Sequence, residues 1–433
     1  MLLWLYRLFF LPALIVMAPG YLLRMRKRGG YGAHFGQRFG GHPVLPAKSA
    51  GAKRVWLQAV SVGEMLAIAP LLEALQTDGA EVYLTTTTST GFRLAAERYR
   101  QLTVGIGYFP LDWWFFSARA WRRIAPDLVI LTEGERWPEH LHQAVRRGVP
   151  VIGINARMSD RTYARLMLLP FAAPALFAGI TRLLPGSAQD EARFRQLGVP
   201  AAKILTTGNI KLDVPTPLLS AAARAQLRRE LGLPDGLVLL GSSTWVGEEE
   251  ALVSALHKVR TSVNCSLLLV PRHAERRGEI AAMLRLSGLK FHFRSSGPAT
   301  NEVDIAVGDT TGELGQFTQL ADLVFIGKSL APHTEGQTPV EAAALEKPIL
   351  FGPGMGNFRV IEADLRARGA AGEVASAAAL RTETLRLLAD RAEREKLAAA
   401  AAEWHRENSG ATARTLAVLR EELAKIPAGR GSS

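Results

Sequence analysis

Residues 55–75 read VWLQAVSVGEMLAIAPLLEAL, an apolar run followed by a segment with helical spacing. We expect Val55–Val62 to form a buried strand and Met65–Leu75 to form the helix that follows it. A strand, a helix and a second parallel strand make the right-handed unit from which α/β sheets are built. This stretch therefore predicts an α/β fold with a parallel sheet.

The same alternation continues along the chain, which at 433 residues is too long for one hydrophobic core. We expect two Rossmann-like parallel-sheet domains, residues 31–207 and 237–400, joined by a Pro-, Asp- and Leu-rich linker at 208–236. Two such domains place a ligand cleft between them, at the carboxyl ends of the strands. An Ala-, Glu- and Arg-rich stretch predicts a C-terminal helix and tail over 401–433. Further strands are expected at Glu81–Thr87, Asp127–Thr132, Val149–Ile154, Lys203–Thr207, Leu237–Leu240, Ser266–Val270, Leu323–Ile326 and Pro348–Phe351, and the last helix over Arg391–Lys425.

The N-terminal segment Leu2–Leu23 is apolar apart from Arg7, Pro12, Pro19 and Gly20. It is long enough to cross a bilayer, and its prolines also allow it to lie in the interface. A cleavable signal carries its charge before the apolar region, whereas here the cations of residues 24–28 come after it. We therefore expect residues 1–30 to be an uncleaved membrane anchor that leaves the rest of the chain cytoplasmic.

The formal net charge of +12 is unevenly distributed. The first acid is Glu64, and the preceding residues carry nine cations: Arg7, Arg24, Arg26, Lys27, Arg28, Arg38, Lys48, Lys53 and Arg54. A basic collar beside an apolar segment indicates anionic lipid as a partner. No nucleic-acid-binding module accompanies the charge, so nucleic acid is not an expected partner. The single cysteine, Cys265, excludes a disulfide framework.

Two acidic motifs follow strands of the first domain. In Ser61-Val62-Gly63-Glu64 we expect Gly63 to allow a tight turn that brings Glu64 to the mouth of the cleft, where a carboxylate is able to act as a general base. On residue type alone, the pattern favours the other interpretation, in which Glu64 only complements a helix dipole. Glu133 and Glu135 are expected to orient a substrate amine, hydroxyl or guanidinium, or to serve only as helix N-terminal charge.

Cations follow other strands of the same domain. Arg157, in Asn155-Ala156-Arg157, and Lys211, in Gly208-Asn209-Ile210-Lys211, are expected where phosphates or a sugar carboxylate would be met. Exposed ion pairs explain both cations nearly as well.

The second domain repeats the pattern with residues suited to a nucleotide. Small and hydroxyl residues at a helix start predict an anion site built from free backbone N–H groups. An arginine after the next strand is expected to clamp a phosphate, and an acid at a later helix start to hold ribose hydroxyls. The candidates are Ser242, Ser243, Thr244, Pro271, Arg272, Gly312, Glu313, Thr338 and Glu341, whereas His273 is as consistent with a structural role.

Several common signatures are missing from the sequence. There is no Walker loop, strand-linked GxGxxG, GxSxG elbow or HExxH motif, and no Asp-x-Asp pair occurs anywhere. We therefore expect neither a metal nor a bound cofactor.

Taken in order, these segments resemble the bacterial 3-deoxy-D-manno-octulosonic acid (Kdo) transferases of lipid A assembly. The resemblance extends from Arg38-Phe39-Gly40 to Asn357-Phe358 and covers nearly the whole chain. Its most specific pieces are Ser61-Val62-Gly63-Glu64, Glu135-Arg136-Trp137-Pro138, Asn155-Ala156-Arg157, Gly208-Asn209-Ile210-Lys211, Pro271-Arg272-His273 and Gly312-Glu313-Leu314.

This resemblance implies a GT-B fold, CMP-Kdo as donor, a lipid A precursor as acceptor, no metal, and a place at the cytoplasmic face of the bacterial inner membrane. It implies that Glu64 is the catalytic base, Arg272 a donor-site residue and Glu341 the ribose ligand. Two departures concern the donor, because the family pattern has His-Asn at Gln337-Thr338 and histidine at Trp245. The alternatives are a related GT-B transferase with another nucleotide sugar, and a scaffold that binds lipid A without catalysis.

Overall fold

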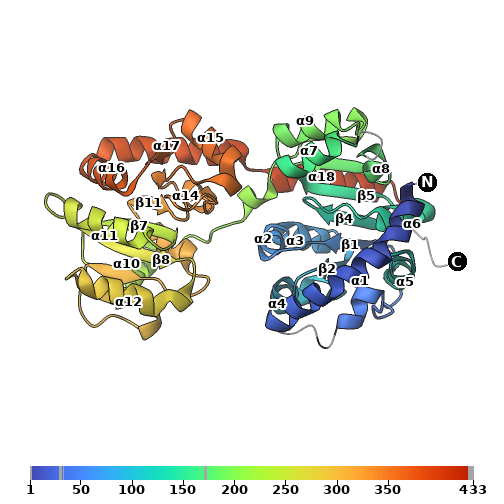
Figure 1. Cartoon of the computed structure of the whole chain (residues 1–433), viewed down its shortest axis with the longest axis horizontal. Helices are drawn as coiled ribbons and strands as arrows, with labels where there is room; N and C mark the ends of the chain where they lie inside the picture. Colours follow the sequence, from blue (N-terminus) through green and yellow to red (C-terminus); the bar gives the residue numbers. More distant parts are fainter. Residues whose placement is uncertain (1, 29–31, 33, 170–172, 428–433) are drawn as a thin grey trace. The chain divides into compact units, whose positions relative to one another are not determined.

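The computed structural model describes the chain except residues 1, 29–31, 33, 170–172 and 428–433. It divides into two compact units (Figure 1). Unit 1 combines residues 1–214 with residues 408–433, and unit 2 comprises residues 215–407. The expected division into successive domains is therefore incomplete, because the C-terminal segment returns to the first unit.

Unit 1 is built on a six-stranded parallel sheet in the order β3-β2-β1-β4-β5-β6. This is the Rossmann order, in which the chain changes direction along the sheet between β1 and β4. Its strands read as continuous apolar runs because helices cover both faces. The strands are β1 (Arg54–Gln58), β2 (Glu81–Thr86), β3 (Gly105–Tyr108), β4 (Leu128–Thr132), β5 (Val151–Ala156) and β6 (Arg182–Pro185).

Unit 2 has a seven-stranded parallel sheet in the order β13-β12-β11-β7-β8-β10-β9. Here the change of direction falls between the first strand, β7, and its neighbour β11. The strands are β7 (Leu237–Thr244), β8 (Cys265–Pro271), β9 (Phe291–Phe293), β10 (Ile305–Val307), β11 (Leu323–Ile326), β12 (Ile349–Phe351) and β13 (Gly372–Glu373).

Helices cover the faces of each sheet. Those of unit 1 are α1 (Leu2–Arg28), α2 (Val62–Ala67), α3 (Ala69–Thr77), α4 (Ser89–Arg98), α5 (Trp114–Ile124), α6 (Pro138–Arg147), α7 (Asp160–Met167), α8 (Ala173–Phe177), α9 (Ala188–Gln196) and α18 (Ala411–Ala424). Those of unit 2 are α10 (Ala221–Glu230), α11 (Glu248–Val259), α12 (Arg277–Leu286), α13 (Leu314–Leu320), α14 (Val340–Ala344), α15 (Arg359–Ala367), α16 (Ala377–Ala389) and α17 (Arg391–Asn408).

The segment 55–75 folds as a strand and helix, with different boundaries from those expected. The strand ends at Gln58, and α2 already begins at Val62 because Ser61 caps it. The expected single helix is two, separated at Ile68, because Pro70 lies in the first turn of α3.

Two other expectations are wrong. Of the expected strand at 203–207, only Ile204 bridges Leu183 of β6, a strand that the apolar pattern missed. The segment 208–236 is not an extended linker, since it holds the turn η4 (Ile210–Asp213) in unit 1 and the helix α10 in unit 2.

The expected last helix is also two helices, because Gly410 between them adopts a left-handed φ of 84°. The second of them, α18, buries Val418 and Leu419 in the core of unit 1 (red, Figure 1). Asp213 fixes its start by accepting hydrogen bonds from the backbone N–H groups of Gly410 and Thr412.

No single described helix is long and apolar enough to cross a bilayer. In α1, Leu3–Phe10 and Pro12–Gly20 satisfy that requirement only together, and they are bent by 42° at their junction. The bend falls where Pro12 interrupts the helical hydrogen bonds. The expected anchor is therefore not confirmed, because only the bent pair taken together has the length and composition of a span.

Candidate active site

The carboxylate of Glu64 lies between β1 and β4, where the sheet of unit 1 changes direction. Its Oε2 accepts hydrogen bonds from the Val60 N–H at 2.9 Å and from the Thr132 hydroxyl at 2.5 Å. Its Oε1 accepts one from the Ser61 hydroxyl at 2.9 Å. A carboxylate oxygen has two acceptor positions, so Oε1 retains one that no described residue occupies. The Glu64 side chain is 7% exposed. The remaining acceptor position on Oε1 is what a general base needs in order to receive a proton.

Glu64 also has the local role that the sequence left open. It stands in the first turn of α2, and its backbone N–H donates to the Ser61 hydroxyl at 3.2 Å. The tight turn expected at Gly63 is absent, because Gly63 is helical and a Cβ there would meet only the Ser61 hydroxyl, at 4.0 Å. Ser61, with its extended backbone, makes the turn instead.

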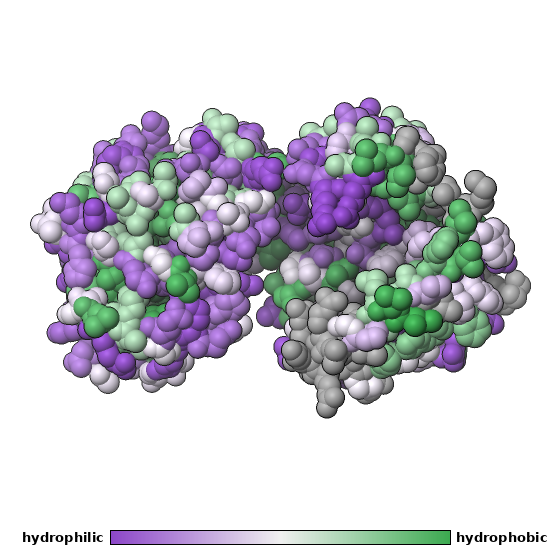
Figure 2. Space-filling model, in the orientation of Figure 1, coloured by the Kyte–Doolittle hydropathy of each residue, from purple (hydrophilic) through white to green (hydrophobic). Residues whose placement is uncertain are grey.

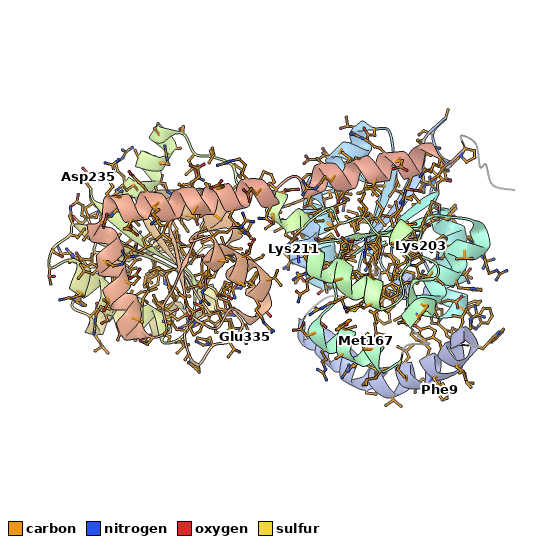
Figure 3. The ribbon with its side chains drawn as sticks, turned by 90° about the horizontal axis from the view of Figure 1, so that it is seen from above. Phe9, Met167, Lys203, Lys211, Asp235 and Glu335 are labelled. Carbon is orange, nitrogen blue, oxygen red and sulfur yellow. The ribbon has the colours of Figure 1, made fainter. Side chains whose placement is uncertain are left out.

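Strained residues stand at the ends of the neighbouring strands. Glu133 after β4 has φ 51° and Asn155 in β5 has φ 48°, a region that non-glycine residues seldom adopt. The Glu133 carboxylate pairs with the ammonium of Lys211, so the ion-pair alternative for Lys211 describes the structure (Figure 3 labels Lys211). Asn155 Oδ1 is buried without a hydrogen-bond partner in the described chain.

Glu135 is partly buried beside Glu64 and Glu133. Burial, together with the charges of Glu64 and Glu133, raises the pKa of Glu135 to about 7. Its Oε2 accepts a hydrogen bond from the Trp137 indole at 2.6 Å. A carboxyl group that titrates near neutral pH in such a cluster is a candidate proton carrier.

Two cations stand near this acidic group. The Arg136 guanidinium lies 5.5 Å from the centre of the Phe177 ring, and burial lowers its pKa. Arg157 follows β5 with an exposed side chain, for which no ion pair is found among the described residues. Arg157 therefore remains available to a phosphate or carboxylate, whereas Lys211 is already paired.

In unit 2 the loops after β7 and β11 are held together by one acid, Glu248. Its Oε2 accepts from the backbone N–H groups of Trp245 at 3.0 Å and Lys328 at 2.7 Å. Its Oε1 accepts from those of Ser329 at 2.8 Å and Leu330 at 3.0 Å. The side chain is 1% exposed, so four loop donors converge on a buried carboxylate.

This arrangement corrects the expectation of free N–H groups around Ser242, Ser243 and Thr244. The Trp245 and Gly247 N–H groups at the helix start are occupied by the side chains of Glu248 and Glu250. Both loops are nevertheless strained, because Ser243 at the end of β7 has φ 55° and Lys328 after β11 has φ 56°. The two loops approach so closely that a Cβ at Gly327 would lie 2.5 Å from the Ser243 carbonyl oxygen.

Trp245 is surrounded by groups that sequence reasoning did not select. The Lys328 ammonium lies 4.3 Å from the centre of its ring and pairs with Glu335 at 3.2 Å (Figure 3 labels Glu335). The His273 ring contacts it edge-on at 5.0 Å. The adjacent Arg272, just after Pro271 of β8, has an exposed side chain, and its backbone N–H donates to the Thr244 carbonyl oxygen at 3.1 Å.

Glu341 lies in a second group, formed by α13 and α14. Its Oε1 accepts from the Thr318 hydroxyl at 3.0 Å, and its Oε2 faces Gly315, where an added Cβ would lie 3.5 Å away. Burial raises the pKa of Glu341. No hydrogen bond to Oε2 is found in the described part of the chain, so it is available to a hydroxyl group.

The remaining candidates are more local in role. Glu313 pairs with Arg294, which also pairs with Glu230. Gly312 precedes it with a left-handed φ of 89°, and the exposed Thr338 accepts a hydrogen bond from the Val340 N–H at 3.3 Å. Among the described residues no three His, Cys, Asp or Glu side chains group as metal ligands would.

Comparisons with known proteins agree with this reading of the two units. Residues 33–214 match the family model described as 3-deoxy-D-manno-octulosonic-acid transferase (kdotransferase). The chain is 34% identical to a 3-deoxy-D-manno-octulosonic acid transferase of Bordetella pertussis, covering 92% of this chain and 94% of that relative. The chain belongs to the Kdo transferase family.

A second Kdo transferase, from Haemophilus influenzae, is 30% identical and covers 96% of this chain and 95% of its own. The UDP-GlcNAc 2-epimerase of Neisseria meningitidis superposes with a TM-score of 0.60, over 85% of this chain and 100% of its own. At 13% identity it shows the shared two-domain, GT-B-like fold alone. This Kdo transferase is accordingly a glycosyltransferase of lipopolysaccharide biosynthesis.

In this Kdo transferase the structure brings several of the predicted site residues of unit 1 together. Glu64, Glu133, Glu135 and Lys211 gather after β1 and β4, joined by Thr132, which the sequence reasoning missed. In unit 2, Glu248 and Lys328 were also missed. No sequence signal marked them, because Glu248 resembles its exposed neighbour Glu250 and Lys328 follows a strand that carries no motif.

Proposed function

We propose that this Kdo transferase takes Kdo from CMP-Kdo and transfers it, by direct inverting displacement, to a hydroxyl of a lipid A precursor. The observation that carries the proposal is the Glu64 carboxylate, held by three hydrogen bonds with one acceptor position left on Oε1. The Kdo transferase relatives support the sugar, and the family resemblance supports the donor and the acceptor.

In the proposed reaction Glu64 accepts the proton of the acceptor hydroxyl as that oxygen attacks the anomeric carbon of Kdo. The bond from this carbon to the phosphate oxygen breaks, and CMP leaves with the bonding electrons. Arg272 is exposed and able to meet the charge that develops on the phosphate. Arg157 orients a phosphate or carboxylate of the bound substrates.

The donor ribose is proposed to bind at Glu341, whose Oε2 accepts a hydroxyl hydrogen bond. Thr338 and Gly312 line the same end of the sheet in this proposal. No metal or cofactor is included, because leaving-group charge is assigned to Arg272. We further propose that the enzyme acts at the cytoplasmic face of the inner membrane, held there by its N-terminal segment and anionic lipids.

Product formation tests this proposal directly. Incubation with CMP-Kdo and a lipid A precursor is expected to yield a lipid whose mass increases by one or more Kdo residues, measured by mass spectrometry. Configuration at the new anomeric centre, read by nuclear magnetic resonance, checks the inversion. Binding of the lipid without a mass increase would make the protein a scaffold and refute the transfer.

A different nucleotide sugar is the second candidate, favoured by Trp245, Gln337 and Thr338 where the family pattern differs. Trp245 carries the Lys328 ammonium against its ring, and Lys328 also pairs with Glu335, so an indole and an ion pair stand where the family pattern has a histidine. Thermal-shift titrations with CMP and UDP separate the two donors. Stronger stabilisation by CMP is expected, and stronger stabilisation by UDP would favour the alternative.

A further inference from the structure

The helix α1 lies along unit 1 instead of projecting from it (Figure 1). Its partly buried residues recur at positions 3, 6, 7, 10, 14 and 18, the spacing of one helical face. The opposite side is exposed over about 20 Å of helix and is almost wholly apolar. That side carries Trp4, Leu5, Leu8, Phe9, Ile15, Val16 and Met17, each at least 45% exposed.

Two polar side chains on the inner face tie α1 to the sheet unit. Arg7 donates from Nε to Glu139 Oε2 at 2.8 Å and from Nη2 to Glu139 Oε1 at 3.1 Å. The Tyr6 hydroxyl donates to Asp112 Oδ2 at 2.7 Å. Glu139 is 0% and Asp112 1% exposed, so α1 supplies partners to two buried acids.

Both acids are fixed at the start of α6, because Glu139 stands in its first turn and Asp112 accepts hydrogen bonds from that turn, so neither can follow α1 into a bilayer. Asp112 accepts from the backbone N–H groups of Glu139 at 3.1 Å and His140 at 2.9 Å. If α1 crossed the membrane, Arg7 and Tyr6 would leave, and two buried carboxylates would lose partners while a guanidinium entered hydrocarbon. The contacts therefore favour a helix that stays on its unit.

Two aromatic residues at the start of α5 are also exposed, close in sequence to the point where α1 is bonded to unit 1. Trp114 and Phe115 follow two and three residues after Asp112, the residue that Tyr6 binds, and they are 47% and 45% exposed. Figure 2 shows apolar residues along the outward side of α1, and Figure 3 places Phe9 on that side. Tryptophan and phenylalanine beside an apolar helix are typical of the lipid–water interface.

The charge of the adjoining sequence identifies the occupant of this face. The first 63 residues contain nine cations and no acid. Arg7, Lys48 and Arg54 pair with acids of unit 1, whereas Arg24, Arg26, Lys27 and Arg28 end the α1 segment. An anionic lipid surface complements that charge, whereas a second copy of this chain would bring the same sign of charge toward it.

We propose that α1 does not span the membrane but lies flat in the surface of an anionic bilayer. It remains attached to unit 1 through Arg7–Glu139 and Tyr6–Asp112 and forms one lipid-binding face with Trp114 and Phe115. The sheet unit that carries Glu64 is thereby held against the bilayer as a rigid part of the enzyme. This placement concerns the membrane contact alone and stands whether or not the sugar donor proves to be CMP-Kdo.

Topology is the deciding experiment. A cysteine at the N-terminus (Leu2→Cys, in a Cys265→Ala full-length chain) is treated in intact spheroplasts with a membrane-impermeant maleimide. A flat helix gives no labelling until the cells are lysed or dissolved in detergent, as does the control Leu218→Cys in unit 2. Labelling of Leu2→Cys in intact spheroplasts would mean that α1 spans and would overturn the proposal.

Vesicle binding tests the face itself. Leu8→Glu is expected to lower the partition of the full-length enzyme onto phosphatidylglycerol vesicles at least about tenfold. The control Leu286→Glu changes an exposed leucine on α12 of unit 2, 89% exposed against 66% for Leu8, and is expected to leave partition unchanged. Unchanged binding of Leu8→Glu, or its conversion of a dimer into a monomer with lipid binding intact, would refute lipid as the occupant.

The ion pair is tested by exchange of its charges. Arg7→Glu is expected to expose α1 to protease in the vesicle-bound enzyme, and Arg7→Glu with Glu139→Arg is expected to restore protection. Equal protection of the wild type and both variants would show that α1 is not held by this pair.

Discussion

Glu64 supports the start of α2 and is also the proposed general base, and two substitutions separate the structural contribution from the proposed chemical one. Glu64→Gln keeps the size of the side chain and removes its basicity, so turnover is expected to fall about 10²–10⁴-fold in a sugar-transfer assay. Ser61→Ala removes the cap of α2 and is expected to cost about 1 kcal/mol of unfolding free energy while turnover changes far less. Equal losses of turnover in both variants would mean that the acid only supports the helix.

The pKa of Glu135 predicts a pH dependence of stability with a definite sign. Its pKa is about 7 in the folded enzyme and 4.5 in the reference state, so the folded chain binds the additional proton between these values. The unfolding free energy contributed by Glu135 is therefore complete below pH 4.5 and is lost as the pH rises through 7, by at most about 3 kcal/mol.

Denaturant titrations at pH 5 and pH 8 measure this loss. The loss should be smaller in Glu135→Gln by the contribution of that one group, whereas the exposed control Glu403→Gln should behave as the wild type. If the unfolding free energy of Glu135→Gln changed with pH as much as that of the wild type, the pKa of Glu135 would not lie near 7.

At the scale of elements, Glu248 joins the loops after β7 and β11 through four backbone hydrogen bonds. Glu248→Gln replaces one carboxylate oxygen by an amide that faces N–H donors. We expect a loss of about 2–4 kcal/mol of unfolding free energy and weaker CMP binding, since both loops are proposed to face the donor.

The matched control is Glu250→Gln, on the same helix but exposed and bonded only to the Gly247 N–H. It is expected to change the unfolding free energy by less than about 1 kcal/mol and to leave CMP binding unaltered. Calorimetric titration with CMP distinguishes the variants, and equal CMP affinity in both would remove Glu248 from the donor loops.

At the scale of the whole molecule, the chain passes through unit 1, then unit 2, and returns to unit 1 with α18. Leu419→Ala in α18 is expected to cost about 2–5 kcal/mol in the unfolding of unit 1, although it lies near the C-terminus. The matched variant Leu387→Ala in α16 should destabilise unit 2 by a similar amount. Differential scanning calorimetry with and without CMP assigns the transitions, and a Leu419→Ala effect confined to the CMP-stabilised transition would contradict this architecture.

The local pattern was sufficient for the class of the fold and for the family, whereas the roles of the site residues stay predictions. Apolar strands flanked by helical stretches predicted parallel sheets in both halves, and the order of short motifs predicted the family. These properties are local, because a parallel strand must be apolar on both faces and a site residue must follow its strand.

The boundaries of the helices and strands, and the partners of the buried polar side chains, could be read only from the tertiary structure. The strand β6, the return of α18 to unit 1 and the docking of α1 each depend on contacts between residues far apart in the chain. The sequence of α1 reads equally as a span or as a surface helix, and only the burial of Glu139 and Asp112 beneath Arg7 and Tyr6 distinguishes them. Likewise Glu248 and Glu250 are the same residue type, two positions apart on one helix. Glu248 is buried and accepts hydrogen bonds from two loops whereas Glu250 is exposed, and only the packing of those loops decides this difference. Sequence periodicity records which residues prefer to be buried, whereas the partner of each buried polar group is set by where distant segments meet.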